Sequence, residues 1–531
     1  MRTARTKEKV GPGSAPWVGQ RRRSVAALVV GCALLAGPVA SALPAYAVPQ
    51  KSGTNTPAPD EPGAVPKGLE SFYSQEVSWY PCGDSGGIQK TDEQGKFSCA
   101  TVTVPMDYNN PDGKTIQVAV KKRAADGESR GSLFINPGGP GGSGISLVEA
   151  VDKSFSKDLL AGYDVVGFDP RGVGSSTPIT CQDAKSAEEA SAEQPQEESS
   201  FENWAQGYMD EVSKLEKQCR EHSEPGLLDH VGTASVARDL DVLRAVSGEK
   251  SLNYLGFSYG TELGYTYAEL FPENAGRLVL DGAMDSTSTN HRLTVETAEG
   301  YEKALHRYVQ ACLEGKAGDN CPLTGSVEDG VQQIRDLITS ANASPLKTSD
   351  PDVKITGAQL TGAIRRYLSG GAWPQLTAAL APAIGQNDAS GFAEAVKQAS
   401  AGVSMTAWTA VMCQDRPAQG NMDAWKAQYE ETQKVAPTFA GGASFDMTCA
   451  AWGHYSKTDP IPQDVHAKGA APILVVGTAG DPATPYHWAQ ALAKQLDSAQ
   501  LLTWDGNAHV AYMRGNKCIT TAVDDFLLGG Q

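Results

Sequence analysis

A serine between two glycines, where an expected strand meets an expected helix, is the first feature of this chain that indicates chemistry. The pentapeptide Gly256-Phe257-Ser258-Tyr259-Gly260 follows the mostly apolar run 252–255 and precedes the helix-like stretch 261–270. A serine at the apex of so tight a turn adopts φ > 0, and its neighbours two residues away must lack bulk. The turn lifts the hydroxyl off the sheet and points the start of a helix at it. The pattern predicts that Ser258 is a nucleophile, provided that the rest of a catalytic site follows.

An acid and a histidine follow in the order used by α/β-hydrolases, which is serine, then acid, then histidine. Asp481 comes just after the expected strand 473–476, at the carboxyl end where active-site groups of open α/β sheets gather. His509 lies 28 residues later, after the expected strand 500–504, and this spacing fits one helix plus one strand. We therefore expect His509 to be the general base and Asp481 the carboxylate that orients it. The rival acid, Asp505, is assigned to shaping the turn.

An oxyanion formed during acyl transfer needs two N–H donors that are already in place. One is expected to be the backbone N–H of Tyr259, the residue after the nucleophile. The second is expected from the loop Asn-Pro-Gly-Gly-Pro-Gly-Gly-Ser-Gly at 136–144, where glycines allow the backbone to approach a substrate closely. We expect the N–H of Gly139, with Gly138 as the alternative. The loop lacks the Gly-Lys-Ser/Thr ending of a phosphate-binding loop and the spacing of a dinucleotide site.

Neither a metal nor a cofactor is expected. No cysteine spacing matches a C-x-x-C zinc site, and the eight histidines do not cluster. Arg171, in the stretch Asp-Pro-Arg-Gly-Val-Gly-Ser-Ser at 169–176, is expected to hold neighbouring loops by buried hydrogen bonds rather than to contact substrate.

The elements needed to position these groups alternate between strands and helices on both sides of a mostly helical stretch. Strands are expected at 99–106, 115–121, 132–135, 163–168 and 277–280 as well as at the two late positions, and helices at 234–246, 304–313, 331–341, 357–368, 373–384 and 519–528. This rhythm predicts an α/β fold with a mostly parallel sheet, helices on both faces and an inserted helical cap. The core is expected at 67–285 and 469–531 and the cap at 286–468, while 186–200 reads as an exposed excursion.

The first 47 residues are expected to be a signal peptide. A basic stretch ends in Arg21-Arg22-Arg23, an apolar run covers 25–43, and Ala45-Tyr46-Ala47 gives a cleavage pattern that places the mature start near Val48. Export through the twin-arginine pathway and a lipoprotein anchor on Cys32 are the alternatives. Residues 48–66 read as a disordered linker or a short propeptide.

Charge and cysteine usage agree with an exported protein. Removing residues 1–47 changes the formal net charge from −17 to −23, which disfavours nucleic acid and anionic lipid as partners, and no span long enough to cross a membrane is expected in the mature chain. Nine of the ten cysteines lie beyond residue 47. Pairing sequence neighbours gives Cys82–Cys99, Cys181–Cys219, Cys312–Cys321 and Cys413–Cys449 and leaves Cys518 over, although sequence alone does not fix connectivity.

Several motifs together resemble one family. The stretches NPGGPGGSG, YDVVGFDPRGVGSS, GFSYGTELGYTYAELFP, RLVLDGAMD, GTAGDPATP and GNAHV are similar to those of secreted actinobacterial tripeptidyl aminopeptidases, which belong with the prolyl aminopeptidase group of α/β-hydrolases. The resemblance runs from about Trp79 to the C-terminus. Prolyl aminopeptidases carry a histidine where Pro137 stands here, and this departure points away from strict proline specificity.

The resemblance implies an exopeptidase that releases tripeptides from peptides or proteins with a free N-terminus, and we expect it to be a monomer. Such an enzyme must bind the substrate ammonium group, for which a carboxylate is the natural partner. The candidates are Glu262 beside the nucleophile and Glu296, Glu299 and Glu302 at the start of the cap. The alternatives are a prolyl aminopeptidase or a lipid or ester hydrolase of the same fold, and a non-catalytic binding protein. The polar start of the cap favours peptides over lipids.

Overall fold

Apolar runs that are buried along nearly their whole length in the middle strands build one central sheet in the computed structural model, which describes residues 63–181, 200–401, 403–441, 444–456 and 459–529. The expected signal peptide, most of the linker and residues 186–199 of the expected excursion lie outside these residues. Within the described chain, nine strands pair in the order β1-β2-β3-β5-β4-β6-β7-β10-β11. Their bounds are β1 Tyr80–Pro81, β2 Phe97–Pro105, β3 Thr115–Arg123, β4 Ser132–Asn136, β5 Asp164–Phe168, β6 Leu252–Phe257, β7 Ala275–Asp281, β10 Ile473–Thr478 and β11 Ala499–Trp504.

The register of the parallel strands places their carboxyl ends together. β1, β2, β3 and β5 pair with their neighbours in the antiparallel direction, whereas β5, β4, β6, β7, β10 and β11 run parallel in that order. Phe257 at the end of β6 pairs with Asp281 at the end of β7, and Asp281 pairs with Val476 of β10. The loops that leave these strands therefore meet at one edge of the sheet, as open α/β sheets require for a site.

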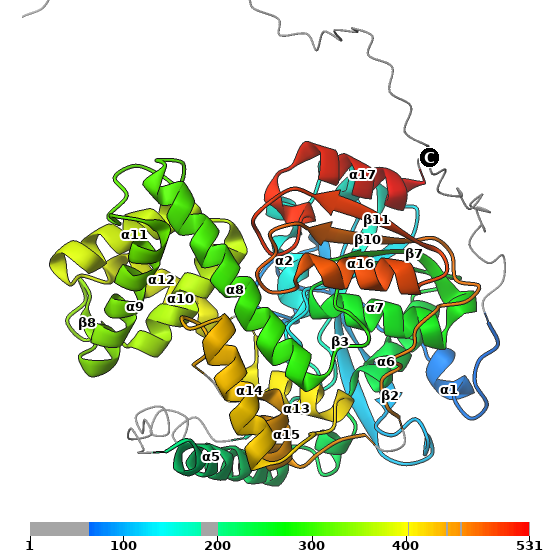
Figure 1. Cartoon of the computed structure of the whole chain (residues 1–531). Helices are drawn as coiled ribbons and strands as arrows, with labels where there is room; N and C mark the ends of the chain where they lie inside the picture. Colours follow the sequence, from blue (N-terminus) through cyan, green and yellow to red (C-terminus); the bar gives the residue numbers. More distant parts are fainter. Residues whose placement is uncertain (1–62, 182–199, 402, 442–443, 457–458, 530–531) are drawn as a thin grey trace, which may run out of the picture. The chain divides into compact units, whose positions relative to one another are not determined.

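Helices cover both faces of the sheet because successive side chains of a strand point to opposite sides. In β4, Phe134 packs in the same apolar cluster as α6, α7 and α16, while Leu133 and Ile135 pack in the cluster that includes α2, α3 and α17. Figure 1 shows these helices against the sheet. The bounds of the helices outside the insertion are α1 Glu70–Tyr73, α2 Gly144–Ser154, α3 Lys157–Gly162, α5 Phe201–His222, α6 Thr233–Val246, α7 Tyr259–Leu270, α16 Tyr486–Gln495 and α17 Lys517–Leu528, with short 3₁₀ turns at Leu227–Asp229, Pro272–Asn274 and Tyr512–Arg514.

The helical insertion, defined here as the chain between β7 and β10, has an apolar core of its own in the part built from α8 to α11. Its helices are α8 Asn290–Leu313, α9 Val327–Ala343, α10 Gly357–Gly370, α11 Trp373–Gln386, α12 Ala393–Ala401, α13 Met405–Asp415, α14 Met422–Val435 and α15 Phe445–Trp452, with a 3₁₀ turn at Ser390–Phe392 and the two-stranded pair β8 Leu346–Lys347 and β9 Lys354–Ile355. α14 and α15 also contact α5, the long helix beside them in Figure 1.

The insertion begins with a much longer helix than the sequence pattern predicts. The expected helix 304–313 is only the second half of α8, which starts at Asn290 after the cap residue Thr289. The first half is polar, and apolar periodicity therefore does not reveal it. Besides the buried side chains Leu293, Val295 and Ala298, ion pairs one turn apart hold it, between Arg292 and Glu296 and between Glu299 and Lys303.

All four expected disulfides are present, which confirms the pairing of sequence neighbours. Cys518 is the free and exposed cysteine among the described residues. No helix in the described part of the chain is both long and apolar enough to cross a membrane.

Candidate active site

Ser258 occupies the strained turn that the glycine pattern predicts. β6 ends at Phe257, α7 begins at Tyr259, and the serine between them has φ 56° and ψ −124°. A β-carbon on Gly256 would overlap the carbonyl oxygen of Gly260, so a bulkier residue two positions before the serine cannot fit. The turn therefore depends on both the conformation of the serine and the glycines beside it.

Asp481 and His509, which lie 28 residues apart in the chain, form a hydrogen-bonded pair. His509 Nδ1 lies 3.0 Å from each oxygen of the Asp481 carboxylate. The same carboxylate accepts the N–H groups of Ala483 and Thr484 at 2.8 and 2.9 Å and the Thr484 hydroxyl at 3.1 Å. These bonds fix Asp481 in a buried position, from which it can orient the imidazole and stabilise its protonated form.

The histidine ring lies beside the strand end that supports the serine. The backbone N–H of Ser258 donates to the carbonyl of Asp281 at 2.9 Å, and Gly282 follows directly. A β-carbon at Gly282 would lie 3.3 Å from His509 Cε1. The end of β7 is thus shared by the turn that carries the serine and the ring of the histidine.

A second buried carboxylate, Asp281, holds the loop after the histidine. Its oxygens accept the N–H groups of Ala511 at 2.9 and 3.0 Å and of Tyr512 at 2.8 Å. Burial raises the pKa of Asp281 to about 6, although these backbone hydrogen bonds oppose the shift. Neither Asp281 nor Thr484 was predicted from the sequence as a site residue. For Asp281, the sequence offers one indication of a role in the site, which is its place directly after the expected strand 277–280.

The glycine-rich loop at 136–144 lies against the amide of Tyr259. The N–H of Gly138 donates to the side chain of Asn136 at 2.9 Å, and Gly142 N–H closes the turn on the Gly138 carbonyl. A β-carbon at Gly138, where φ is 89°, would lie 3.0 Å from the Tyr259 nitrogen. Because Tyr259 is the first residue of α7, its N–H has no acceptor within the helix. Since the Gly138 N–H already donates to Asn136, Gly139 stays the predicted second donor.

The insertion contacts both loops that follow the late strands. Ser369, in the last turn of α10, accepts the His509 N–H at 2.8 Å through its carbonyl. Arg307 of α8 donates to the Gly480 carbonyl and to the Asn507 side chain, each at 2.8 Å. The loops of Asp481 and His509 are therefore held from the insertion as well as from the sheet.

Each of the four glutamates considered for binding an ammonium group already has a cationic partner in the chain. Glu262 is buried and bonded to Arg416 at 2.8 Å. Glu302 bonds to Arg335 at 2.7 Å. Glu299, whose side chain is 38% exposed, pairs with Lys303.

Glu296 is the fourth of these glutamates and contacts the start of α16. Its carboxylate accepts hydrogen bonds from Arg292 and His487, each at 2.8 Å, and from the indole N–H of Trp488. Burial opposes ionisation of Glu296, but the hydrogen bonds outweigh it and lower the pKa to about 2. Glu296 is thus a carboxylate near the segment that follows Asp481.

Arg171 has the structural role that the sequence predicts. Its guanidinium is fully buried and forms two hydrogen bonds with Asp239, at 2.6 and 2.7 Å. It also donates to the carbonyls of Pro105, Met106 and His230. It therefore fastens the end of β2 and the segment before α6 to the loop after β5.

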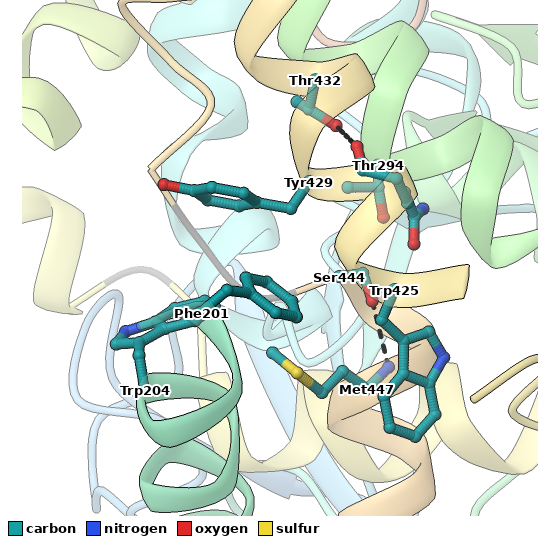
Figure 2. Close-up of a pocket in the computed structure, with 9 residues that line it drawn as sticks. Phe201, Trp204, Thr294, Trp425, Tyr429, Thr432, Ser444 and Met447 are labelled. Atoms are coloured by element: carbon teal, nitrogen blue, oxygen red, sulfur yellow. Dashed lines mark hydrogen bonds between the residues drawn. The ribbon is translucent and has the colours of Figure 1, made fainter. Parts of the chain in front are cut away.

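A separate aromatic pocket lies between α5, α8, α14 and α15. Figure 2 shows Phe201, Trp204 and Tyr429 facing Met447 and Trp425 across it. None of the residues that line it comes from the loops of the serine, the acid or the histidine. Among the described residues, no three His, Cys, Asp or Glu side chains are grouped to hold a metal ion.

Comparisons with known proteins agree with this fold. Residues 131–320 match the model of the alpha/beta hydrolase fold, and residues 436–531 match that of TAP-like proteins. Serine protease Hip1 of Mycobacterium tuberculosis is 34% identical over 480 residues, which cover 87% of this chain and 90% of the relative. Carboxylesterase B of the same organism is 34% identical over 96% of this chain and 97% of its own length. Tripeptidyl aminopeptidase of Streptomyces lividans is 33% identical over 86% of this chain and 85% of its own length.

Proposed function

This chain belongs to the α/β-hydrolase family, with a TAP-like C-terminal region, and is a serine hydrolase; from that premise we propose that it is an exported exopeptidase. It releases tripeptides from the free N-terminus of peptides and proteins. The four disulfides agree with an oxidising compartment. We further propose that the enzyme is a monomer and that residues 286–468 form a cap that limits how many substrate residues fit.

The proposed reaction is acyl transfer through a covalent intermediate. Ser258 attacks the carbonyl carbon of the third residue while His509 accepts its proton, and Asp481 stabilises the imidazolium. The oxyanion accepts hydrogen bonds from the N–H groups of Gly139 and Tyr259. His509 then protonates the leaving amine, and water hydrolyses the acyl-enzyme by the reverse sequence of proton transfers.

One observation supports this chemistry more than any other. The Asp481–His509 pair is made by residues from two different loops, and both approach the strand end that supports the strained Ser258. A structural aspartate after a strand would need only local partners. The choice of peptide as substrate rests on the tripeptidyl aminopeptidase and serine protease among the relatives.

The four glutamates differ in the free energy needed to separate each of them from its present cationic partner, and this difference narrows the choice of ammonium site. Taking Glu262 from Arg416 would leave a buried guanidinium unpaired, which costs several kcal/mol. Glu302 is buried and also bonds Arg335 and Thr438. Glu299 and Glu296 are therefore the better candidates, because their partners Lys303 and Arg292 reach solvent and can exchange.

An ester hydrolase is the second candidate function. The observation that favours it is the similarity to Carboxylesterase B over nearly the whole chain. A prolyl aminopeptidase is less well supported, because Pro137 stands where that group has a histidine.

The test is to incubate the chain from Val48 onward, and its Ser258→Ala variant, with one peptide that carries either a free or an acetylated N-terminus. Mass spectrometry of the products should show loss of successive three-residue units from the free peptide only, and no loss with the variant. Removal of single residues would support a prolyl-type aminopeptidase. Turnover of a simple ester without cleavage of either peptide would replace the peptidase by the esterase.

A further inference from the structure

The start of helix α13 is seated on the glycine-rich loop that supplies one proposed oxyanion donor. Ser404, which caps α13, donates its N–H to the carbonyl of Gly141 at 3.2 Å, and Val403 forms a β-bridge with Gly142. The fit is close, because a β-carbon at Gly141 would lie 2.7 Å from the Ser404 carbonyl oxygen. A Val403 methyl likewise lies 3.3 Å from the position of a β-carbon at Gly139.

The other end of α13 is bonded to the residue that supplies the second proposed donor. Asp415, the last residue of α13, accepts the N–H of Thr233 at 2.7 Å and its hydroxyl at 2.5 Å. The Thr233 hydroxyl is in turn hydrogen-bonded to the phenol of Tyr259. All three side chains are buried. A continuous chain of hydrogen bonds therefore joins α13 to the residue directly after the nucleophile.

Charge and covalent bonds hold this end of α13 in place. Arg416 donates to Glu262, in the first turn of α7, at 2.8 Å and to the carbonyl of Ser288 at 3.1 Å. Burial, followed by the nearby charge of Glu262, raises the pKa of Asp415 well above its ordinary value. The disulfide Cys413–Cys449 ties α13 to α15. The helix thus has little freedom to shift relative to α7.

We propose that α13 sets the separation of the two N–H donors of the oxyanion hole, with Asp415 as a positioning residue that acts through Thr233 on Tyr259. The inference rests on the proposed function only for the assignment of Gly139 and Tyr259 as donors. Its consequence is that the insertion contributes to the rate of the chemical step as well as to substrate length. An oxyanion donor is effective only at hydrogen-bond distance, and displacements near 1 Å can reduce a rate about a hundredfold.

Asp415 also has a plain stabilising role that the experiment must separate. Thr233 is the first residue of α6, and the preceding cap residue, Gly232, has no side chain to bond the free amides. The Asp415 carboxylate takes that place. Loss of activity in Asp415→Ala alone would therefore not distinguish positioning from unfolding.

Two nearly isosteric variants break the hydrogen bonds that link Asp415, Thr233 and Tyr259 through hydroxyl groups, and both leave the cap of α6 intact. Thr233→Val removes the hydroxyl but keeps the N–H that Asp415 accepts, and Tyr259→Phe removes only the phenol oxygen. Both are measured with their double variant and with Asp415→Ala. Thr409→Ala serves as the matched control on the same helix, because its hydroxyl bonds only to the carbonyl of Met405. The readouts are kcat and KM on a small activated ester, the affinity for a boronic acid that forms a tetrahedral adduct with the serine, and Tm.

We expect each single variant to lower kcat about tenfold and to weaken boronic acid binding by a similar factor, with KM within twofold of the wild type. The double variant should be no more than about twofold slower than either single variant, because both cut the same chain. Asp415→Ala should lose at least as much, and Thr409→Ala should match the wild type. Wild-type kcat in folded Thr233→Val and Tyr259→Phe would overturn the proposal. So would a raised KM at unchanged kcat, which would make this chain of residues a substrate contact.

The ester and the boronic acid keep this test separate from the peptidase claim. A wild-type enzyme that cleaves esters but no peptide contradicts the proposed substrate and leaves the positioning result valid. An enzyme that turns over neither substrate contradicts the proposed function, and the comparison of boronic acid affinities between variants still decides the role of α13.

Discussion

Ser258, Asp481 and His509 follow three different strands, so their relation depends on strand register and on no local motif. Phe257, Asp281 and Val476 lie side by side across β6, β7 and β10. In the proposed triad, Ser258 directly follows β6, Asp481 follows β10, and His509 follows β11, the strand next to β10. At this scale the sequence contains the order of the residues, and the sheet supplies the distances.

The assignment of the acid makes the first prediction. Asp481→Asn should lower kcat by about 10⁴-fold, because an amide cannot hold the imidazole in the tautomer that accepts the serine proton. Asp505→Asn is the matched control, since Asp505 is exposed and lies four residues before His509. Steady-state kinetics on the same ester measure both. A loss of comparable size in Asp505→Asn with an active Asp481→Asn would reverse the assignment.

The buried Asp281 makes a prediction about stability and pH. Burial raises its pKa from 3.8 to about 6 on folding, so between these values the folded chain binds more protons than the unfolded chain. The contribution of this group is fully present below about pH 4 and is lost as the pH rises through 6, with a slope of up to about 1.4 kcal/mol per pH unit.

Denaturant unfolding of the wild type and of Asp281→Asn across pH 4 to 7 checks that prediction. The free energy of unfolding of the wild type, relative to that of the variant, should fall between pH 4 and 6 and level off above. The exposed carboxyl variant Asp505→Asn should run parallel to the wild type throughout. A difference that rises with pH would mean that hydrogen bonds to Ala511 and Tyr512, rather than burial, govern the carboxylate.

Residues that act through tertiary contacts were beyond sequence reasoning. Asp281, Thr484 and Asp415 each bond a partner that lies more than 20 residues away in the chain. Their types are common at strand ends, turns and helix ends, so type and spacing do not set them apart. The outcome differs for Arg171, where a charged residue inside a glycine-rich turn indicated a buried network.

At the scale of elements, Arg171 makes the third prediction. Arg171→Met should lower the free energy of unfolding by about 3–5 kcal/mol, because it leaves the buried Asp239 without its partner. The exposed Arg220, paired with a Glu216 that also bonds His454, provides the control, and Arg220→Ala should change stability by less than about 1 kcal/mol. Denaturant unfolding measures both. A stable Arg171→Met enzyme with a raised KM would instead indicate substrate contact.

Most buried strands were predicted from the sequence, whereas the polar first half of α8 and the helix α2 were not. The strands 132–135 and 473–476 differ from β4 and β10 by one or two residues at their ends. The first half of α8 was missed because its few buried apolar side chains, Leu293, Val295 and Ala298, lie among charged residues. That half carries Glu296 and Glu299, so the proposed ammonium site lies on a helical segment that was not predicted from the sequence.

At the scale of the whole molecule, the described chain combines a sheet with two apolar faces and an insertion with a separate core. Alternating strands and helices were enough to predict this class of fold. The insertion contacts the loops that carry the proposed reacting groups, among other places through Ser369, Arg307 and α13. We therefore expect changes in the insertion to alter both substrate length and rate.

The proposed reaction requires that Ser258 forms an acyl-enzyme with the first three residues of a peptide. The most direct measurement is acid quenching of the enzyme during turnover, followed by digestion and mass analysis of the fragment that contains Ser258. We expect an added mass equal to the three N-terminal residues as an acyl group, seen with the free peptide and absent both with the acetylated peptide and in Ser258→Ala. An adduct of a single residue, or an adduct on another side chain, would contradict it.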